Sequence, residues 1–318
     1  MASKDKPRAR VRAFVCILGV ALTLSGCSWL REASGLRAES GLRAESVLDV
    51  ILSDNTSAYT EVARELTRQH DGRVEIYRID GDSARSLEVQ QRVQQSDRTV
   101  VVAVGLAAAQ MATRLVNKQI IFCQVFNYED ARLLATGVKG VSATPPVAEQ
   151  FRVWKRLYPP LKEIGVVTGS GLRALLAEAQ AAAREHNIKL VHAEVRTDKE
   201  MLRAYKQMAP KVQGFWLLPD NRILSRESVR DLLSFSAKQG KQVLVFTPEL
   251  LGSGALLSAA SDPADVAGRV VSIIGSKNRA EEAPVLPLTQ TRFRISVEMA
   301  KWLDLPLAPE FRKLAYVP

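Results

Sequence analysis

The sequence predicts an α/β fold made of two lobes, each built on a mostly parallel sheet. Short runs rich in branched apolar residues recur along the chain, and helical patterns lie between them. This alternation starts again near Glu163, after the proline-containing stretch at 144–146, which favours two open sheets over one closed barrel. The expected strands are 47–52, 74–79, 99–104, 119–125, 163–168, 190–195, 214–218 and 242–246. The expected helices are 58–69, 107–116, 147–157, 172–185, 199–208 and 225–239.

The expected strands are mostly apolar on both faces, as buried parallel strands are. Alternating strands and helices imply right-handed crossovers that cover both faces of each sheet. In an open parallel sheet, ligands bind beyond the carboxyl ends of the strands, where helix N-termini expose amide groups. With two such sheets, the expected ligand site is the cleft between them, and the residues that follow each strand are the candidates.

The first 26 residues have the layout of an export signal. Five basic residues lie between positions 4 and 12, and an uncharged run at 13–25 leads into Leu24-Ser25-Gly26-Cys27. A membrane-spanning helix needs about 20 apolar residues, so this run is too short to remain as an anchor. We therefore expect residues 1–26 to be a signal peptide that is removed.

The Leu-Ser-Gly-Cys run resembles the lipobox of bacterial lipoproteins. The resemblance implies that a lipid is attached to Cys27 and that this residue becomes the first of the mature chain. An ordinary secretory signal with an incidental cysteine, or a short anchor that is never cut, are the alternatives. In Gram-negative lipoproteins, a residue other than Asp after the cysteine usually permits sorting to the outer membrane, and Ser28 stands there.

Residues 27–46 are expected to be a spacer between the lipid and the folded part. The hexamer Ser-Gly-Leu-Arg-Ala-Glu occurs twice in tandem, at 34–39 and 40–45, and its glycine and charge are typical of a tether. Five basic residues and Asp5 leave with the signal, so the formal charge of +10 falls to +6. No dense basic block with interleaved aromatic residues remains, so the sequence gives no reason to expect nucleic-acid binding.

The motifs of the common enzyme classes are absent from the sequence. The three histidines, His70, His186 and His192, have no partners at metal-ligand spacing. There is no phosphate-binding loop of the nucleotide hydrolases and no Gly-x-Ser-x-Gly elbow. The run 168–172 is better interpreted as a structural turn than as a dinucleotide site. We expect no enzyme activity, no metal and no cofactor.

Four segments carry a resemblance to a known family. The first contains Ser57 and Tyr59 at the expected start of a helix, and the second runs from Ile120 to Asp130, followed by the Gly-Val-Ser turn within 137–142. The third is Leu217-Leu218-Pro219-Asp220-Asn221, with Ser225 heading the next helix, and the fourth comprises 242–246, 254–256 and 262–268. Together, in this order and spacing, they resemble the substrate-binding proteins of ABC transporters, with the two-lobed type I fold of periplasmic binding proteins.

The resemblance implies a clamshell with hinge segments that closes on a small molecule and hands it to a membrane permease. It assigns residues 47–142 to the first lobe, completed by about 252–285, and residues 143–251 to the second. The C-terminal residues 286–318 are expected to pack near the hinge. The same resemblance makes the protein a periplasm-facing component of the cell envelope.

Carried over to this sequence, the resemblance gives six candidate ligand-binding residues, each just past an expected strand. Ser57 and the adjacent helix amides are suited to a carboxylate, Tyr59 to an apolar body and Asp220 to an ammonium group. The same residue types are also frequent helix caps and surface covers. The six candidates are Ser57, Tyr59, Gly105, Asn127, Asp220 and Asn221.

The sequence departs from the family in two places. Leu106 and Ala107 stand where relatives have Ser or Thr, and the polar loop is reduced to 169–171. A cleft with fewer polar contacts favours a more apolar ligand. It also keeps open an alternative function, in which an outer-membrane lipoprotein uses this fold as a sensor or binds an envelope protein, without transport.

Overall fold

The computed structural model describes residues 47–129, 131–136, 138–276 and 283–317. The expected signal peptide, the tether, Cys27 and Ser28 lie outside these residues. From Ala44 onward the chain forms one compact unit, which contains both expected lobes. In the part that is described, no helix is both long and apolar enough to cross a membrane.

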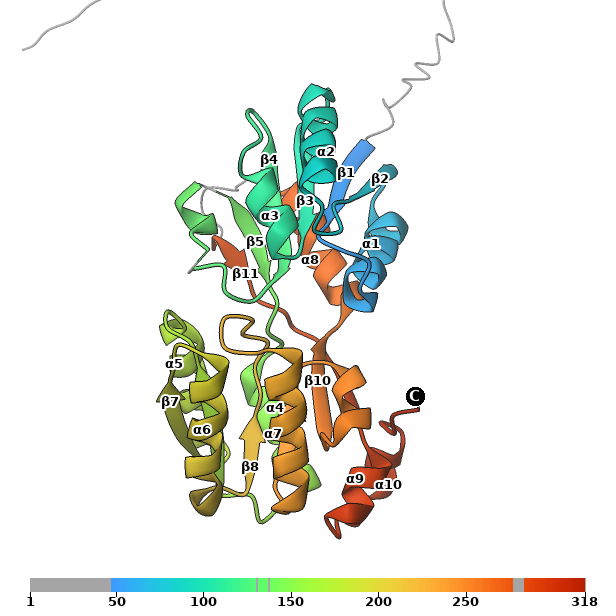
Figure 1. The fold of residues 1–318 in the computed structure, drawn as a ribbon. Coiled ribbons are helices and arrows are strands. Elements are labelled where there is room, and N and C mark those ends of the chain that lie inside the picture. Colours follow the sequence, from blue (N-terminus) through green and yellow to red (C-terminus); the bar gives the residue numbers. More distant parts are fainter. Residues whose placement is uncertain (1–46, 130, 137, 277–282, 318) are drawn as a thin grey trace, which may run out of the picture. The chain divides into compact units, whose positions relative to one another are not determined.

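The first lobe is built on a six-stranded parallel sheet (Figure 1). Its strand order is β11-β5-β4-β3-β1-β2, and all of these neighbouring strands pair in parallel. The strands are β1 (Val47–Leu52), β2 (Arg73–Arg78), β3 (Val100–Val104), β4 (Gln119–Val125), β5 (Lys139–Ser142) and β11 (Val285–Leu286).

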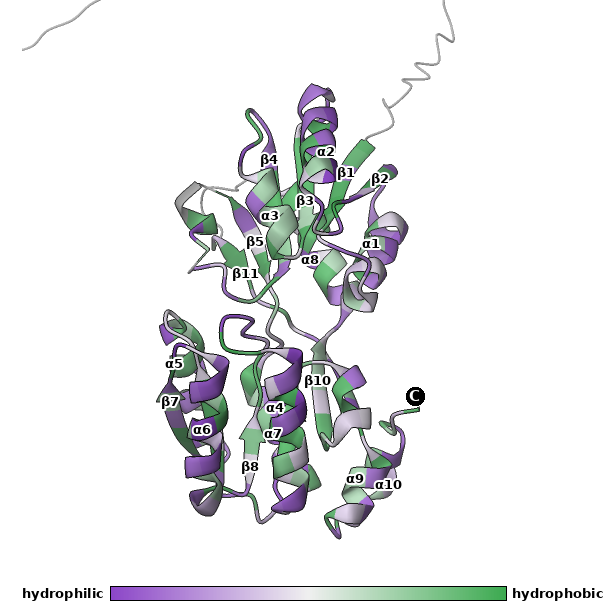
Figure 2. Ribbon diagram, viewed as in Figure 1, coloured by the Kyte–Doolittle hydropathy of each residue, from purple (hydrophilic) through white to green (hydrophobic). Residues whose placement is uncertain are grey.

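Alternation along β1 separates the two faces of this sheet. Leu48, Val50 and Leu52 point into a core shared with helices α1 and α8, whereas Ile51 joins the opposite core, which α2 and α3 cover. Figure 2 shows the matching pattern in the helices, whose apolar stripes turn toward the sheet. The helices are α1 (Ser57–Gln69), α2 (Ser83–Gln95), α3 (Leu106–Ala112) and α8 (Pro263–Gly275), with a 3₁₀ turn η1 (Leu133–Thr136).

The second lobe repeats this plan with strand order β12-β10-β9-β8-β6-β7. Its strands are parallel except for the edge strand β12, which pairs antiparallel with β10. The strands are β6 (Glu163–Thr168), β7 (Lys189–Glu194), β8 (Gly214–Trp216), β9 (Gln242–Val245), β10 (Leu257–Ser261) and β12 (Thr291–Ile295). The expected fold class, two lobes on parallel sheets, is confirmed.

Helices cover both faces of the second sheet as well. One core includes residues of α4, α5, α9 and α10, and the other includes residues of α6 and α7. The helices are α4 (Val147–Leu157), α5 (Arg173–Glu185), α6 (Asp198–Met208), α7 (Arg226–Lys238), α9 (Val297–Trp302) and α10 (Pro309–Arg312), with 3₁₀ turns η2 (Ala209–Lys211) and η3 (Pro248–Ser253).

The return to the first lobe lies later than expected. Residues 252–261 were assigned to the first lobe, but β10 pairs with β9 in the second sheet. The crossing comes at Asp262, whose carboxylate accepts hydrogen bonds from the first amides of α8. The chain then crosses back between β11 and β12, so residues 291–295 join the second sheet and α9 and α10 pack in its core.

Helices α2, α9 and α10 and strands β5, β10, β11 and β12 have no counterpart among the expected strands and helices. Helix α2 buries only Val89 and Val93 along its length, and its other residues are largely polar, so its apolar periodicity is weak. Strand β5 is only four residues long and contains Gly140, which packs directly against the ring of Phe122. A glycine in so short a run indicates a turn rather than a strand when only the sequence is known.

Candidate functional site

A cavity of about 550 Å³ lies between the carboxyl ends of the two sheets. It is lined by the start of α1, the residues after β4, β8 and β9, the crossing at 143–145, the end of β10 and one residue of β12. All of these segments belong to the one compact unit that begins at Ala44. The cavity therefore occupies the position at which parallel sheets bind ligands.

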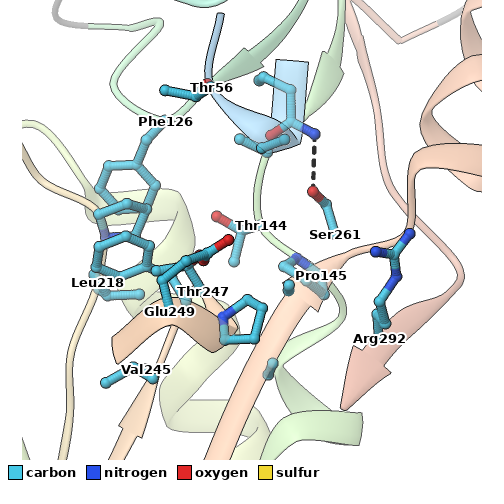
Figure 3. Close-up of a pocket in the computed structure, with 18 of the residues that line it drawn as sticks. Thr56, Phe126, Thr144, Pro145, Leu218, Val245, Thr247, Glu249, Ser261 and Arg292 are labelled. Carbon is cyan, nitrogen blue, oxygen red and sulfur yellow. Dashed lines mark hydrogen bonds between the residues drawn. The ribbon is translucent and has the colours of Figure 1, made fainter. Parts of the chain in front are cut away.

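Apolar side chains form much of the cavity wall. Phe126 and Leu218 stand on one side of the space shown in Figure 3, and Pro145 lies across from them. Trp216 also lines the cavity although it is only 1% exposed. Its Nε1 donates a hydrogen bond of 3.1 Å to Oε1 of Gln150, so the indole is held in a fixed orientation.

Glu249, in η3, lines the cavity from the second lobe, and its contacts with described residues are all with neutral donors. The hydroxyl of Ser57 donates a hydrogen bond of 3.1 Å to its Oε1, and the hydroxyl of Thr247 donates to Oε2. Burial opposes ionisation, but the hydrogen bonds from Thr247, its own backbone N–H and Ser57 outweigh it and lower the pKa of Glu249. Among the residues that the structure describes, no cation pairs with this carboxylate.

Arg292 is the cavity's guanidinium, and it is already paired. Its Nη1 lies 2.8 Å from Oε2 of Glu61 on α1, so the pair joins the two lobes. Both side chains are about one third exposed, and an ion pair of this kind contributes little to stability. Its charges cancel within the cavity, which leaves Glu249 as the unbalanced charge.

The N-terminus of α1 opens into the same cavity. Thr56, its N-cap residue, makes no side-chain capping hydrogen bond, and the backbone N–H of Thr56 donates to Asp54 at 2.9 Å. Ser57 and Ala58 follow and also line the cavity. A helix of 13 residues presents partial positive charge and free amide donors at this end, which favours an anionic group.

Four of the six candidates from the sequence are brought together at the cavity. Ser57 and Tyr59 line it from α1, Asn127 from the segment after β4, and Asn221 from the segment after β8. Burial, followed by the nearby negative charge of Asp54, raises the pKa of Tyr59 to about 12. Tyr59 is therefore a neutral phenol at any physiological pH.

Gly105 does not line the cavity, but it positions residues that support it. Its φ is +88°, and an added Cβ would lie 2.6 Å from the Ser53 hydroxyl oxygen and 2.8 Å from the Tyr59 ring. Only glycine fits between these side chains with that backbone angle. The Ser53 hydroxyl in turn accepts a hydrogen bond of 3.0 Å from the amide of Ala108, near the start of α3.

Asp220 also lies outside the cavity lining, and its carboxylate already has partners. Its oxygens accept hydrogen bonds of 2.7 Å from Nε and 2.7 Å from Nη2 of Arg222, and one of 2.9 Å from the amide of Gly169. Its side chain is 1% exposed. Asp220 thus fixes the loop after β8 against the loop after β6, and no free carboxylate is presented to an ammonium group.

Gln124 connects the two lobes beside the cavity. It interrupts β4 at a register shift, with a φ of +56° that is unusual for a residue other than glycine. Its amide Nε2 donates a hydrogen bond of 2.8 Å to the hydroxyl of Ser261, at the end of β10 (Figure 3). The bulge therefore turns the side chain toward the second lobe.

Several lining residues were missed from the sequence. Phe126, Thr247 and Glu249 follow strands closely, so the rule that selected Asn127 also covers them. Arg292 lies inside an antiparallel edge strand, and no pattern in the sequence distinguishes it. In the described part of the chain, no three His, Cys, Asp or Glu side chains gather in a way that could hold a metal ion.

Comparison with protein families gives one match. The sequence profile of the family described as "ABC transporter substrate binding protein" matches residues 69–315. No curated protein matches the chain significantly.

Solved structures with the same fold come from several bacteria. An ABC domain from Streptococcus pneumoniae in complex with L-Trp has a TM-score of 0.61 and 18% identity, covering 86% of this chain and 99% of that one. A conserved domain protein from Vibrio cholerae O1 biovar El Tor has a TM-score of 0.60 and 19% identity, covering 85% and 98%. The ligand-free, open form of a substrate binding protein with adhesive properties from Clostridium difficile has a TM-score of 0.62 and 15% identity, covering 86% and 99%.

The structural role of Asp220 leads to a prediction about stability. Asp220→Ala leaves Arg222, 21% exposed, without its bidentate partner, and breaking such a buried pair costs about 3 kcal/mol. Urea denaturation should show this loss in the free energy of unfolding. Asp231→Ala is the matched control, because Asp231 is 56% exposed and 4.0 Å from its arginine partner, so its change should stay within about 0.5 kcal/mol. Equal stability of the two variants would contradict the assignment.

Proposed function

Because this chain belongs to the family of ABC transporter substrate-binding proteins, we propose that its interlobe cavity captures an amino-acid-like solute with an apolar side chain for an ABC importer. Members of the family are binding proteins rather than enzymes, and membership confirms that part of the sequence expectation. Binding a small molecule and delivering it to a permease is the expected role of the family.

The observation that carries the proposal is the unbalanced carboxylate of Glu249. Its described partners are the neutral hydroxyl groups of Ser57 and Thr247, while the cavity's arginine is paired with Glu61. A ligand ammonium group would supply the missing positive charge, and hydrogen bonds between charged groups are the strong ones. Glu249 thus takes the role that the sequence suggested for Asp220.

The start of α1 supports the other half of a zwitterion. The carboxylate of an amino acid is matched by free amide donors and the positive end of a helix dipole. Ser57 lies between the proposed sites for the ligand's carboxylate and ammonium groups, because it heads α1 and its hydroxyl donates to Glu249. The two charged groups of the ligand would therefore be held close together, as they are on an amino acid.

The apolar wall supports the proposed side chain. Phe126, Leu218 and Val245 line a cavity whose volume is in the range of small-molecule sites. This wall agrees with the departures at Leu106 and Ala107, where the family's polar residues are missing. The relative from Streptococcus pneumoniae was solved with L-Trp, a ligand with both a zwitterionic end and an apolar side chain.

A first test is to screen amino acids by melting temperature. A ligand that binds only the folded protein raises its stability, so amino acids with apolar side chains should raise the melting temperature more than acidic ones. Phe126→Ala should lower the affinity for the best-binding amino acid by at least about tenfold, since truncating a buried aromatic contact costs more than about 1.4 kcal/mol of binding free energy. Phe235→Ala, on α7 against Lys206, is the same substitution outside the cavity and should bind normally. No shift with any amino acid would reject the proposed ligand class.

A second test uses the charge of Glu249. The depressed pKa keeps the carboxylate ionised below the usual range of a glutamate, so affinity for an ammonium ligand should hold from neutral pH and fall only at pH values below that usual range. Glu249→Gln should lower the affinity about tenfold at pH 7 and remove this acidic fall. Calorimetry over a pH series measures both effects. Unchanged affinity in Glu249→Gln would place the ammonium group elsewhere.

The proposal includes a lipid anchor on Cys27, after removal of residues 1–26. The lipobox-like run at 24–27 and the duplicated tether support it, and Ser28 favours the outer membrane in a Gram-negative cell. An importer's binding protein works beside an inner-membrane permease. Outer-membrane sorting therefore favours the alternative function, in which the same cavity serves a sensor or an envelope partner.

A third test follows from the anchor. In a Gram-negative host, the full chain should partition with membranes and Cys27→Ser should lose the acyl group, as judged by detergent-phase partition and the mass of the N-terminal peptide. Cys16→Ser is the matched control, because Cys16 lies within the segment to be removed and its loss should change neither readout. Separation of the two membranes should place the wild type in the outer one and Ser28→Asp in the inner one. Acylation of Cys27→Ser, or no acylation of the wild type, would contradict the anchor.

A further inference from the structure

The amino-terminal edge of the second sheet carries an open concavity of about 910 Å³ with a strong excess of positive charge. Of the described residues that line it, six are cationic and one, Glu163, is acidic. We call this surface the basic face. Its cations are Lys155, Lys162, Arg184, Lys189, Lys211 and Lys241.

The strand register places these charges along one edge. Glu163 is opposite Lys189 in the pairing of β6 with β7. The backbone N–H of Gln213 donates to the carbonyl oxygen of Glu163 at 2.9 Å, and that of Gln242 donates to Gln213 at 3.2 Å. Neighbouring strands lie about 4.8 Å apart, so the lysines that enter β6, β7 and β9 stand side by side. Together with Lys211 before β8, they form one continuous row.

Most of the charge on this face is not neutralised. Lys189 pairs with Glu163 at 2.9 Å, and the ammonium groups of Lys155 and Lys241 donate to the backbone carbonyls of Leu161 and Val212. The side chains of Lys162, Arg184 and Lys211 have no hydrogen bond or ion pair with any described residue. The face therefore keeps a net charge that attracts anions.

The first lobe provides an internal comparison, because its sheet has the same topology. At its amino-terminal edge, Arg98 pairs with the fully buried Asp49 at 2.5 Å and with Glu75 at 2.7 Å. Arg92 pairs with the same Glu75 at 3.2 Å. Two cations at this edge of the first lobe, Arg92 and Arg98, are thus matched by carboxylates, whereas Lys162, Arg184 and Lys211 of the second lobe are not.

Helix ends explain only part of the excess. Lys155 and Arg184 lie in the last turns of α4 and α5, where a cation stabilises the helix. Lys162, Lys211 and Lys241 lie outside α-helices, at entries to strands. No aromatic residue lines the face, so the base-stacking platform of single-stranded nucleic-acid binding is missing from its described lining. An open surface rich in lysine is suited to several phosphate groups at once.

We propose that the basic face binds the anionic phospholipid headgroups of a membrane surface. The site is at the amino-terminal edge of the sheet, and the cavity for the small molecule is at the carboxyl edge, so both can be occupied together. Each lysine or arginine near an anionic membrane strengthens binding by roughly fivefold. A row of several unmatched cations is therefore sufficient for measurable binding without any inserted apolar residue.

The test uses the full chain with Cys27→Ser, so that no acyl group contributes, and vesicles of phosphatidylcholine with or without phosphatidylglycerol. Hydrogen exchange should show protection at 155–162, 184–189 and 211–213 only when phosphatidylglycerol is present. Binding should weaken as salt rises, since screening shortens the reach of the charges. Protection confined to residues before Val47 would overturn the proposal.

Variants complete the test. Lys162→Glu with Lys211→Glu should lower the affinity for phosphatidylglycerol vesicles at least about tenfold. The control variant, Lys199→Glu with Arg203→Glu, makes the same charge change at exposed positions of α6, away from the basic face. It should bind the vesicles as tightly as the protein without these substitutions. An equal loss of vesicle affinity in both variants would show that only the net charge of the protein matters, and it would overturn the assignment to the basic face. Binding of inositol hexakisphosphate with no binding of the vesicles would assign the face to a soluble polyanion and reject the membrane.

Discussion

Parallel strand pairing is the constraint on which the rest of this protein depends. Because neighbouring strands run in the same direction, all of their carboxyl ends reach one edge, and the crossover helices begin there. The two sheets bring such edges to a common cavity, where the start of α1, the segment after β4 and the segments after β8 and β9 meet. Residues 192 positions apart in the sequence, Ser57 and Glu249, therefore come within 3.1 Å.

The residues that follow strands at this edge either hold loops in place or face the cavity. Asp220 and Gly105 belong to the first kind: one binds Arg222 and Gly169, and the other leaves room for Ser53 and Tyr59. Glu249 and Asn127 belong to the second kind. For the two carboxylates, Asp220 and Glu249, the division follows from burial. A carboxylate at 1% exposure must be satisfied by the protein itself, whereas a more exposed one retains capacity for a ligand.

The sequence predicts much of the fold, because buried parallel strands such as β1 and β4 are short and mostly apolar. The position of the cavity follows from the same pattern, and Ser57, Tyr59, Asn127 and Asn221, which the family resemblance selected, line it. The structural role of Asp220 could not be predicted, since its pairing with Arg222 depends on the local geometry of the loop after β8. Arg292 was missed because the edge strand that carries it was not among the expected strands. The crossing at Asp262 was missed because the small residues on both sides of it show little periodicity.

The described chain passes between the lobes at 143–146, at Asp262 and at 287–290. This triple connection restricts the relative motion of the lobes more than a single connection would. It also gives the protein mechanical tolerance: a break in any one connection leaves two others to keep the halves in register.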